Sequence, residues 1–443
     1  MIACFAWTNT QILNITNAKI NLFADDKADL YIRMGGHMSE ALINSVKKSG
    51  VFENIYCLDP FKINYTKLKF GFLPNFRVLF LRHAYSQAYK HLLERLNGIR
   101  TYDRAILAWF YTENVFLLDW WSRGKENFKI TFVDEGTGSY CYTKKQMIFP
   151  VSLIGSKKAL IKRYLAEYAL SRKMSRKVDS ICYYRPEFCR PDIDYKKLTL
   201  PIVSEETNPL MCQILRGATS DLDMIHFSQY EKRKAIYLST FSVEGASFDE
   251  QSLDMLTTME TVFGRNRVIA KIHTGNTNHA VNFAKSHEKK IYVDRDKYIF
   301  EGLYMQLPNR GKKVFVSCVS TASIYPKFMF NEEPYVIFTY RLYNTYKQVG
   351  VERDDWMSQA VIDAYEDKSK VMIPNSMYEL KQMLKRVMPQ ICDEFQVAPN
   401  VFLLEEDTMA DYVYENDGEA GDSSEDHQQD TPADPAADEK GKN

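Results

Sequence analysis

The chain has 443 residues, which is more than one hydrophobic core usually supports, so two domains are expected. Apolar residues make up 45% of it and aromatic residues 13%, enough for two cores. No apolar run approaches the length that spans a bilayer, and the first residues lack the basic region and long apolar core that a signal peptide would show. The formal net charge of zero conceals an asymmetry, because 14 of the 57 acidic residues but only 2 of the 57 basic ones lie in 405–443, which leaves 43 acidic and 55 basic residues in 1–404.

Strand-like and helix-like stretches alternate through the first 185 residues. The expected strands are 2–7, 28–32, 54–58, 104–108 and 129–133, and the expected helices include 38–48 and 76–96. Such alternation is typical of a parallel sheet that is covered by helices. The first domain is therefore expected to be of the α/β class.

Residues 186–233 are richer in proline and polar side chains, and we expect them to form the crossing between two domains. Alternation then resumes. The expected strands are 235–238, 267–272, 290–293, 313–316 and 335–339, and the expected helices are 248–263, 296–306 and 377–394. Two Rossmann-like domains that face each other across a cleft are the simplest architecture.

Polar residues follow the expected strands where chemistry is usually found. Asp134, Glu135 and Gly136 come directly after the apolar strand 130–133. In open α/β sheets, ligands bind outside the carboxyl ends of the strands, and a carboxylate there can act as a general base. Acidic residues and glycine are also ordinary residues of a turn, so this motif gains weight only from partners elsewhere in the chain.

Two later strands end in groups of that kind. Strand 267–272 is followed by His273, and strand 313–316 is followed by the hydroxyl-rich run 317–323, after which a helix is expected. The N–H groups and positive dipole at a helix start favour anions, and Ser or Thr hydroxyls add donors. Carboxylate, imidazole and hydroxyl groups at three strand ends suit a base, an acid and a phosphate cradle.

In this order the motifs resemble the bacterial sialyltransferases of the GT-B type, the lipooligosaccharide sialyltransferases and polysialyltransferases. That family combines an acidic pair before glycine, a His-Pro motif and a paired Ser/Thr motif. Here 134–136 matches the first and Ser320-Thr321 the third, whereas Thr274 follows His273 where the family has proline. The opening segment 7–14 also looks like the start of those enzymes, and the resemblance covers residues 1–400.

The resemblance implies an inverting transfer of sialic acid from CMP-sialic acid to a cell-surface glycan, lipooligosaccharide or capsular polysaccharide, without metal or other cofactor. Glu135 would be the base and Asp134 a supporting acid. His273 would donate to the leaving phosphate. Ser320 and Thr321 would cradle that phosphate. Lys271, beside the His273 strand, would add positive charge or point away from the site, and Ser317 and Gly136 are further expected donor-binding residues. Residues 1–185 would bind the acceptor and 234–404 the nucleotide sugar.

Two alternatives remain open. A metal-dependent transferase would use an Asp-x-Asp pattern to hold a UDP-sugar, and this pattern occurs at 192–194, 221–223 and 294–296. A non-catalytic glycan-binding or polysaccharide-assembly protein would need none of the three strand-end motifs. No nicotinamide or ATP motif is present, and no nucleic-acid motif accompanies the basic charge.

Two segments bear on partners and location. Residues 156–178 read as an amphipathic basic helix, which either contacts an anionic membrane peripherally or packs on its own domain. The acidic tail 405–443 is expected to be disordered, since its final part has almost no apolar side chains. The eight cysteines form no C-x-x-C pair and are expected to be reduced, buried thiols, which is typical of a cytoplasmic protein.

Overall fold

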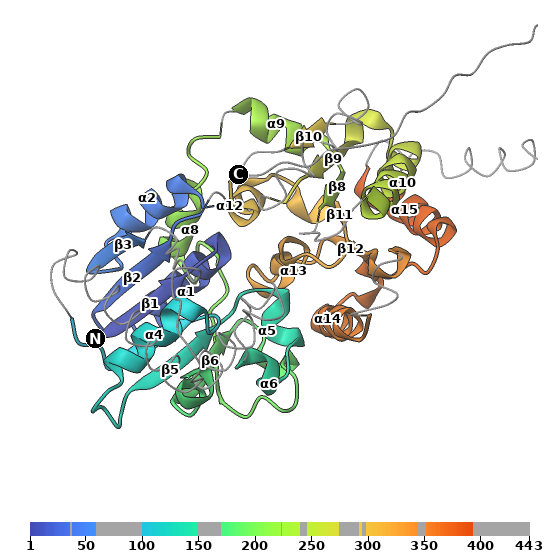
Figure 1. Ribbon diagram of the computed structural model, residues 1–443. Helices are drawn as coiled ribbons and strands as arrows, with labels where there is room; N and C mark the ends of the chain where they lie inside the picture. The colour runs from blue at the N-terminus through green and yellow to red at the C-terminus, as the bar shows by residue number, and fades with distance from the viewer. Residues whose placement is uncertain are drawn as a thin grey trace, which may run out of the picture. The chain divides into compact units, whose positions relative to one another are not determined.

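A computed structural model of the chain describes residues 1–35, 38–58, 100–148, 170–222, 224–239, 246–273, 292–294, 298–343 and 351–392. Both sheets of the protein belong to one compact unit, Met1–Gln396. Figure 1 shows the strands of each sheet side by side, with helices packed along them.

The first sheet has seven parallel strands in the order β3-β2-β1-β4-β5-β6-β7. Their bounds are β1 Ile2–Ala6, β2 Ala28–Arg33, β3 Asn54–Leu58, β4 Arg104–Leu107, β5 Lys129–Val133, β6 Val178–Tyr183 and β7 Lys196–Thr199. The strands β1, β2 and β5 are almost entirely buried, because helices cover both faces of a parallel sheet and its strands are apolar runs rather than alternating ones.

The second sheet has six parallel strands in the order β10-β9-β8-β11-β12-β13. Their bounds are β8 Ala235–Leu238, β9 Val268–Lys271, β10 Tyr292–Asp294, β11 Val314–Ser317, β12 Tyr335–Phe338 and β13 Val371–Met372. Both sheets thus contain the doubly wound order 3-2-1-4-5-6, in which the direction of winding reverses between β1 and β4 and between β8 and β11. Such a switch point is where the crevice of an open α/β sheet lies.

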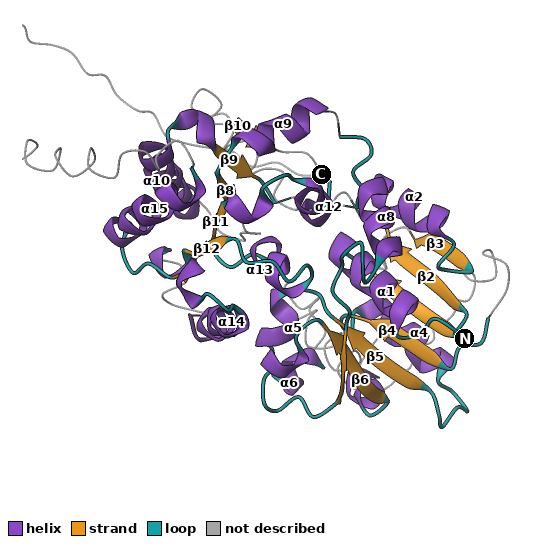
Figure 2. Cartoon of the chain, turned by 180° about the vertical axis from the view of Figure 1, so that it is seen from behind, coloured by secondary structure: helices purple, strands orange, loops and turns teal. Residues whose placement is uncertain are grey.

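Helices connect the strands and cover the sheets (Figure 2). Around the first sheet and the crossing they are α1 Asn9–Asn21, α2 Glu40–Ser49, α4 Thr112–Trp121, α5 Thr137–Cys141, α6 Lys144–Met147, α8 Pro209–Gly217 and α9 Met224–Lys232. Around the second sheet they are α10 Ala246–Phe263, α12 Phe300–Gln306, α13 Thr321–Phe328, α14 Val351–Ala364 and α15 Met377–Ile391. Short 3-10 helices are η2 Pro186–Phe188, η3 Arg265–Arg267, η4 Arg310–Lys312, η5 Tyr340–Leu342 and η6 Lys368–Lys370.

The predicted α/β class with two Rossmann-like domains is confirmed, and every strand predicted from the sequence is present. The first sheet continues past residue 185. Strand β7 lies inside the segment 186–233 that was predicted to be the crossing, and it pairs with β6. Helix α1 was not predicted, since Asn and Thr are frequent in it and it has no clear apolar stripe. The predicted helix 76–96 and the tail 405–443 lie outside the described residues.

Two further predictions meet the structure only in part. All eight cysteines are free and seven are buried, but Cys57 is exposed on the edge strand β3. Of the basic segment 156–178 the described residues begin at 170, and there Lys173 pairs with Asp119 at 2.8 Å. In the described ranges, none of the helices combines the length and apolar composition needed to cross a membrane.

Candidate active site

The candidate residues lie at the carboxyl edges of both sheets. Asp134 and Glu135 follow β5, next to the switch point of the first sheet. Ser317 ends β11, at the switch point of the second sheet, and His273 follows β9. Parallel strands deliver all of these groups to the same edge of their own sheet, as the sequence predicted.

Asp134 is fully buried and surrounded by donors. Its Oδ1 accepts the N–H of Gly136 at 2.6 Å and the hydroxyl of Tyr325 at 3.2 Å. Its Oδ2 accepts the hydroxyl of Tyr140 and the N–H of Tyr184, the latter at 3.4 Å. Burial raises the pKa of this carboxyl to about 6, although all four donors favour its ionised form.

Tyr325 belongs to α13, so this carboxylate bonds directly to a helix of the second sheet. Asn14 of α1 strengthens the same link, because its Nδ2 donates both to the backbone oxygen of Asp134 at 2.8 Å and to the Tyr325 hydroxyl at 2.7 Å. Buried polar groups of this kind are costly unless they are satisfied, and here every partner is present. Asp134 therefore organises the contact between the β5 loop and α13.

Gly136 and Thr321 touch at this contact. Gly136 has φ 100° and ψ −142°, a conformation that side chains rarely adopt. A Cβ at this position would lie 2.2 Å from Oγ1 of Thr321, and that Oγ1 accepts the N–H of Thr137 at 3.3 Å. Figures 1 and 2 show α5, which follows Gly136, beside α13. Two of the three sequence motifs are thus brought together.

Glu135 lies next to this contact and is partly buried. Its Oε2 accepts Nε2 of Gln11 at 2.9 Å, and its backbone N–H donates to Oγ of Ser139 at 2.7 Å. The pKa of the Glu135 carboxyl is raised to about 8, chiefly by burial and in smaller part by the negative charge of Asp134, while the hydrogen bond from the Gln11 amide lowers it. A carboxyl with a pKa close to neutral pH is suited to general acid–base chemistry.

The start of α13 is built by serine hydroxyls. Ser320 is its N-cap residue, and its N–H donates to Oγ of the buried Ser317 at 3.4 Å. Ser317 also bonds to Oγ of Ser323 at 2.9 Å, and Ser323 donates to the backbone oxygen of Ser320 at 2.7 Å. Ser317 and Ser323 thus fix the turn, whereas Ser320 and Thr321 lie at the helix start, where anions are favoured.

His273 lies two strands away from this helix start. Its side chain is exposed, and its backbone N–H donates to Oγ of Ser239, which follows β8, at 2.8 Å. The order β9-β8-β11 separates it from Ser317 by two strand spacings, roughly 10 Å. The role of His273 stays a prediction. Thr274, which stands at the family's proline position, lies outside the described residues.

Lys271 is buried in a different cluster. Its Nζ lies 3.5 Å from Oδ2 of Asp294 and 3.9 Å from the ring centre of Tyr298. The same carboxylate accepts the hydroxyls of Tyr230 and Tyr298, and His226 lies 3.4 Å from it. Lys271 therefore has a partner in its own domain, and its contact with a donor stays a prediction.

The same cluster bears on the metal alternative. Asp294 is the first acid of the pattern 294–296 and faces a lysine and two tyrosine hydroxyls, surroundings that suit an anion receiving hydrogen bonds. Asp296 and Asp223 lie outside the described residues. Asp192 and Asp194 both bond to Lys144, through its backbone N–H and its ammonium group. In the described ranges, no group of three metal-binding side chains comes together.

Sequence reasoning missed the contribution of α1. Gln11 and Asn14 are fully buried and bond to the acidic motif, although they stand more than a hundred residues before it. One signal was available: Thr8 followed three residues later by Gln11 is a helix-start pattern, and the Thr8 hydroxyl indeed accepts the N–H of Gln11 at 3.2 Å. That pattern predicts the helix, but it does not predict that the Gln11 side chain reaches Glu135.

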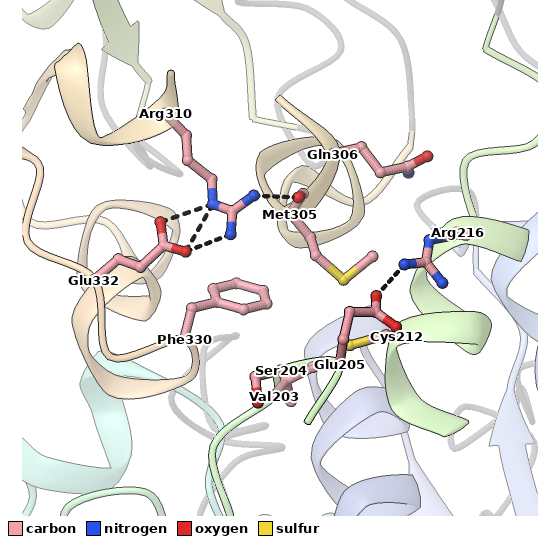
Figure 3. A pocket seen from close by; sticks show the side chains of 10 residues that line it. All are labelled: Val203, Ser204, Glu205, Cys212, Arg216, Met305, Gln306, Arg310, Phe330 and Glu332. Atoms are coloured by element: carbon pink, nitrogen blue, oxygen red, sulfur yellow. Dashed lines mark hydrogen bonds and ion pairs between the residues drawn. The ribbon is translucent and has the colours of Figure 1, made fainter. Parts of the chain in front are cut away.

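A pocket of about 470 Å³ lies elsewhere in the same unit (Figure 3). It is lined by Val203, Ser204, Glu205, Cys212, Arg216, Met305, Gln306, Arg310, Phe330 and Glu332. Its charges are balanced in pairs, since Arg310 donates to both oxygens of Glu332 and Arg216 bonds to Glu205. Arg310 and Glu332 precede β11 and β12, so they lie at the amino edge of the second sheet, opposite the edge that carries the candidate site.

Comparisons with known proteins identify no family. No family model matches the chain, and no curated protein matches it. Among solved structures, UDP-GlcNAc 2-epimerase from Methanocaldococcus jannaschii is 11% identical with a TM-score of 0.48, over 88% of this chain and 92% of that one. The enzyme of that name from Neisseria meningitidis, bound to UDP-GlcNAc, is 11% identical with a TM-score of 0.45, over 88% and 99%. Arabidopsis thaliana UGT89C1 complexed with UDP-L-rhamnose is 10% identical with a TM-score of 0.47, over 88% and 90%.

Proposed function

We propose that the protein is an inverting glycosyltransferase that uses a nucleotide sugar, with Glu135 as its general base. The observation that carries the proposal is the contact of Gly136 and Thr137, which follow Glu135, with Thr321 at the start of α13. It joins a carboxyl whose pKa is raised to about 8 to a helix start that suits a phosphate. A base for the acceptor and a cradle for the leaving group are the two requirements of such a transfer.

The donor we propose is CMP-sialic acid and the acceptor a cell-surface glycan, lipooligosaccharide or capsular polysaccharide. The choice of this donor and this acceptor is supported by the resemblance of the motifs at 134–136 and 320–321 to those of the bacterial sialyltransferases. The basic character of residues 1–404 suits an anionic donor and a site at the inner face of a membrane.

In the proposed reaction, ionised Glu135 removes the proton from the acceptor hydroxyl. The oxygen attacks the anomeric carbon of sialic acid, the bond from that carbon to the phosphate oxygen breaks, and CMP leaves with the bonding electrons. Hydroxyls of Ser320 and Thr321 and the first N–H groups of α13 stabilise the departing phosphate. His273 donates a hydrogen bond or a proton to the same phosphate. One displacement inverts the configuration at the anomeric carbon.

The decisive experiment incubates the full chain with CMP-sialic acid and glycans that end in galactose or sialic acid, and measures CMP release. Parallel incubations contain UDP-sugars with and without Mn²⁺, and CMP-sialic acid with EDTA. We expect turnover of CMP-sialic acid that survives EDTA and is inhibited by CMP. Turnover of a UDP-sugar that requires Mn²⁺ would instead establish the alternative with a metal-bound donor, and binding of glycan without turnover would establish a non-catalytic role.

A pair of variants then assigns the roles. Glu135→Gln keeps the shape of the side chain but cannot take a proton, so kcat should fall by about a hundred- to ten-thousand-fold while CMP binding is retained. His273→Ala should lower kcat with little loss of stability, because the exposed side chain leaves no cavity. Unchanged turnover by Glu135→Gln would remove Glu135 from the role of base.

A further inference from the structure

One buried amide holds the carboxylate of Glu135. Gln11 lies in the first turn of α1, is fully buried, and donates through Nε2 to Oε2 of Glu135 at 2.9 Å and to the hydroxyl of Tyr111 at 3.2 Å. Its Oε1 accepts the backbone N–H of Trp7 at 2.7 Å. Since a backbone N–H can only donate, the amide oxygen must face Trp7 and the amide nitrogen must face Glu135.

The partners of Gln11 are themselves held in place. The rings of Trp7 and Tyr111 are stacked, with centroids 3.9 Å apart and planes 8° apart, and the guanidinium of Arg33 lies 4.4 Å from the Trp7 ring centre. These residues follow or end β1, β2 and β4, so three neighbouring strands supply the stack. It fixes the Tyr111 hydroxyl, and with it the second hydrogen bond of the Gln11 amide.

We propose that Gln11 is a positioning residue for Glu135, which fixes the carboxylate in one orientation and favours its ionised form. The inference rests on the proposed role of Glu135 as the base. An amide N–H donates a hydrogen bond but does not accept the proton, so Gln11 supports ionisation without competing for the proton that Glu135 takes from the acceptor. The Tyr111 hydroxyl completes the geometry.

The charged and titratable groups around Glu135 make this support necessary. Burial makes the largest contribution to the raised pKa of Glu135, and the negative charge of Asp134, its neighbour in the chain, makes a smaller one. Burial raises the pKa of Tyr111 and of Tyr183 on β6, and the charge of Glu135 adds to both shifts. The positive charge of Arg33 acts on Tyr111 in the opposite direction. Among the described groups that act on Glu135, the Gln11 amide is the one that lowers its pKa.

The test uses Gln11→Met in the full chain, because methionine keeps the length of the side chain but has no amide. The dependence of kcat on pH should show its rising limb shifted upward by about one to two pH units, since a hydrogen bond to the charged form is lost. Activity near neutral pH should fall about tenfold or more, with the KM for the donor nearly unchanged. Gln11→Asn, which keeps the amide but is one methylene shorter, should shift the profile in the same direction.

A matched control removes another buried amide from the same helix. Asn17 donates to the backbone oxygen of Pro201 at 2.9 Å and accepts from Asn208 at 2.9 Å. Asn17→Ala should destabilise the protein comparably but leave the pH at which activity rises unchanged. If Gln11→Met lowers kcat without moving the pH profile, or if Asn17→Ala moves it equally, the amide acts on the fold and the proposal is wrong.

A second measurement is independent of transferase activity. Thermal unfolding is followed from pH 4 to 9 for the wild type, Glu135→Gln, Gln11→Met and the double variant. The loss of stability that Glu135 causes should begin near pH 4.5 in both backgrounds, but without Gln11 it should continue to higher pH and become larger. The same loss at pH 9 with and without Gln11 would overturn the proposal even in a protein that transfers no sugar. A larger loss without Gln11 in an inactive protein would retain the Gln11–Glu135 coupling while rejecting the proposed function.

Discussion

Two adjacent carboxyls at the end of β5 have different surroundings. Asp134 is fully buried and accepts four hydrogen bonds, whereas Glu135 is only partly buried and its carboxyl accepts one from Gln11. The pKa is raised to about 6 for Asp134 and to about 8 for Glu135. Their environments therefore suit a structural and a catalytic role.

Glu135→Gln should increase the stability of the protein at neutral and alkaline pH. The pKa of Glu135 is raised from 4.5 to about 8 in the folded chain, so in this interval the folded state holds a proton that the unfolded state has lost. Stability must then fall as pH rises from 4.5 to 8, and the variant avoids this loss. We expect a gain of about 1–3 kcal/mol in the free energy of unfolding at pH 8, measured by urea denaturation.

The same measurement at pH 4 is the control. Glu135 is protonated there in the folded state, and largely so in the unfolded state, so the variant and the wild type should differ little. An equal gain at both pH values would mean that the effect comes from packing and not from ionisation of the carboxyl.

Asp134→Asn should destabilise the protein although it removes a buried charge. Each carboxylate oxygen of Asp134 accepts one backbone N–H, from Gly136 or from Tyr184. In either orientation of an asparagine, its NH₂ group faces an N–H that has nothing to bond to, which costs about 1–3 kcal/mol. Tyr325→Phe is the milder comparison, because it removes one of the four donors to Asp134 and leaves the others. If Asp134→Asn lowers the melting temperature less than Tyr325→Phe does, this explanation is wrong.

At the level of elements, the loop after β5 and the start of α13 fit through one glycine. Gly136→Ala adds a side chain where φ is 100° and where its Cβ would lie 2.2 Å from Thr321 Oγ1. Backbone strain and crowding should together lower the free energy of unfolding by about 2–4 kcal/mol, and activity should fall with the displaced loop. The measurement is denaturant unfolding combined with CMP release.

Two comparisons separate strain from crowding. Gly124 also has positive φ, at 69°, but a Cβ there meets nothing within 4 Å, so Gly124→Ala should show the cost of the backbone conformation alone. In a Thr321→Ala background, Gly136→Ala should cost less than in the wild type. Equal costs in both backgrounds would show that the close approach of these two residues does not limit the substitution.

The sequence predicts strands here more completely than helices and contacts. Buried parallel strands are apolar runs that end in polar or glycine residues, so β1, β5 and β11 can be recognised together with the side chains at their ends. Helix α1 gives no such signal, because its inward face carries Gln11, Asn14 and Asn17 and therefore has no apolar period. Its polar face is buried because it bonds to Glu135, Asp134 and Tyr184, and that requirement arises only in the folded protein.

At the level of the whole molecule, each of the two sheets has its own switch point, and the two sheets share one winding order. Alternation of strands and helices predicts each sheet, and the carboxyl-edge rule predicts that 134–136, 273 and 317–321 are strand-end groups. It does not predict that Tyr325 bonds to Asp134, because the two are 191 residues apart and the bond depends on how α13 packs. The pairing of the acidic motif with Thr321 therefore comes from the fold, and the role of His273 still awaits the kinetic test.

At the scale of the whole chain, residues 416–443 lower the net charge. Residues 416–443 contain nine acidic and two basic residues, and alanine is their only apolar residue type. Deleting them removes almost no surface that burial could stabilise, so the melting temperature should change by less than about 2 °C and CMP release with a soluble acceptor should be unaffected. The deletion leaves a surplus of seven positive charges, so binding to vesicles of anionic lipid, measured by sedimentation, should become stronger and should weaken again as salt is added. A tail of equal length built from Gly and Ser is the control for length, and it should bind vesicles like the deletion variant. A large loss of melting temperature in both variants would mean that the acidic residues stabilise the folded protein.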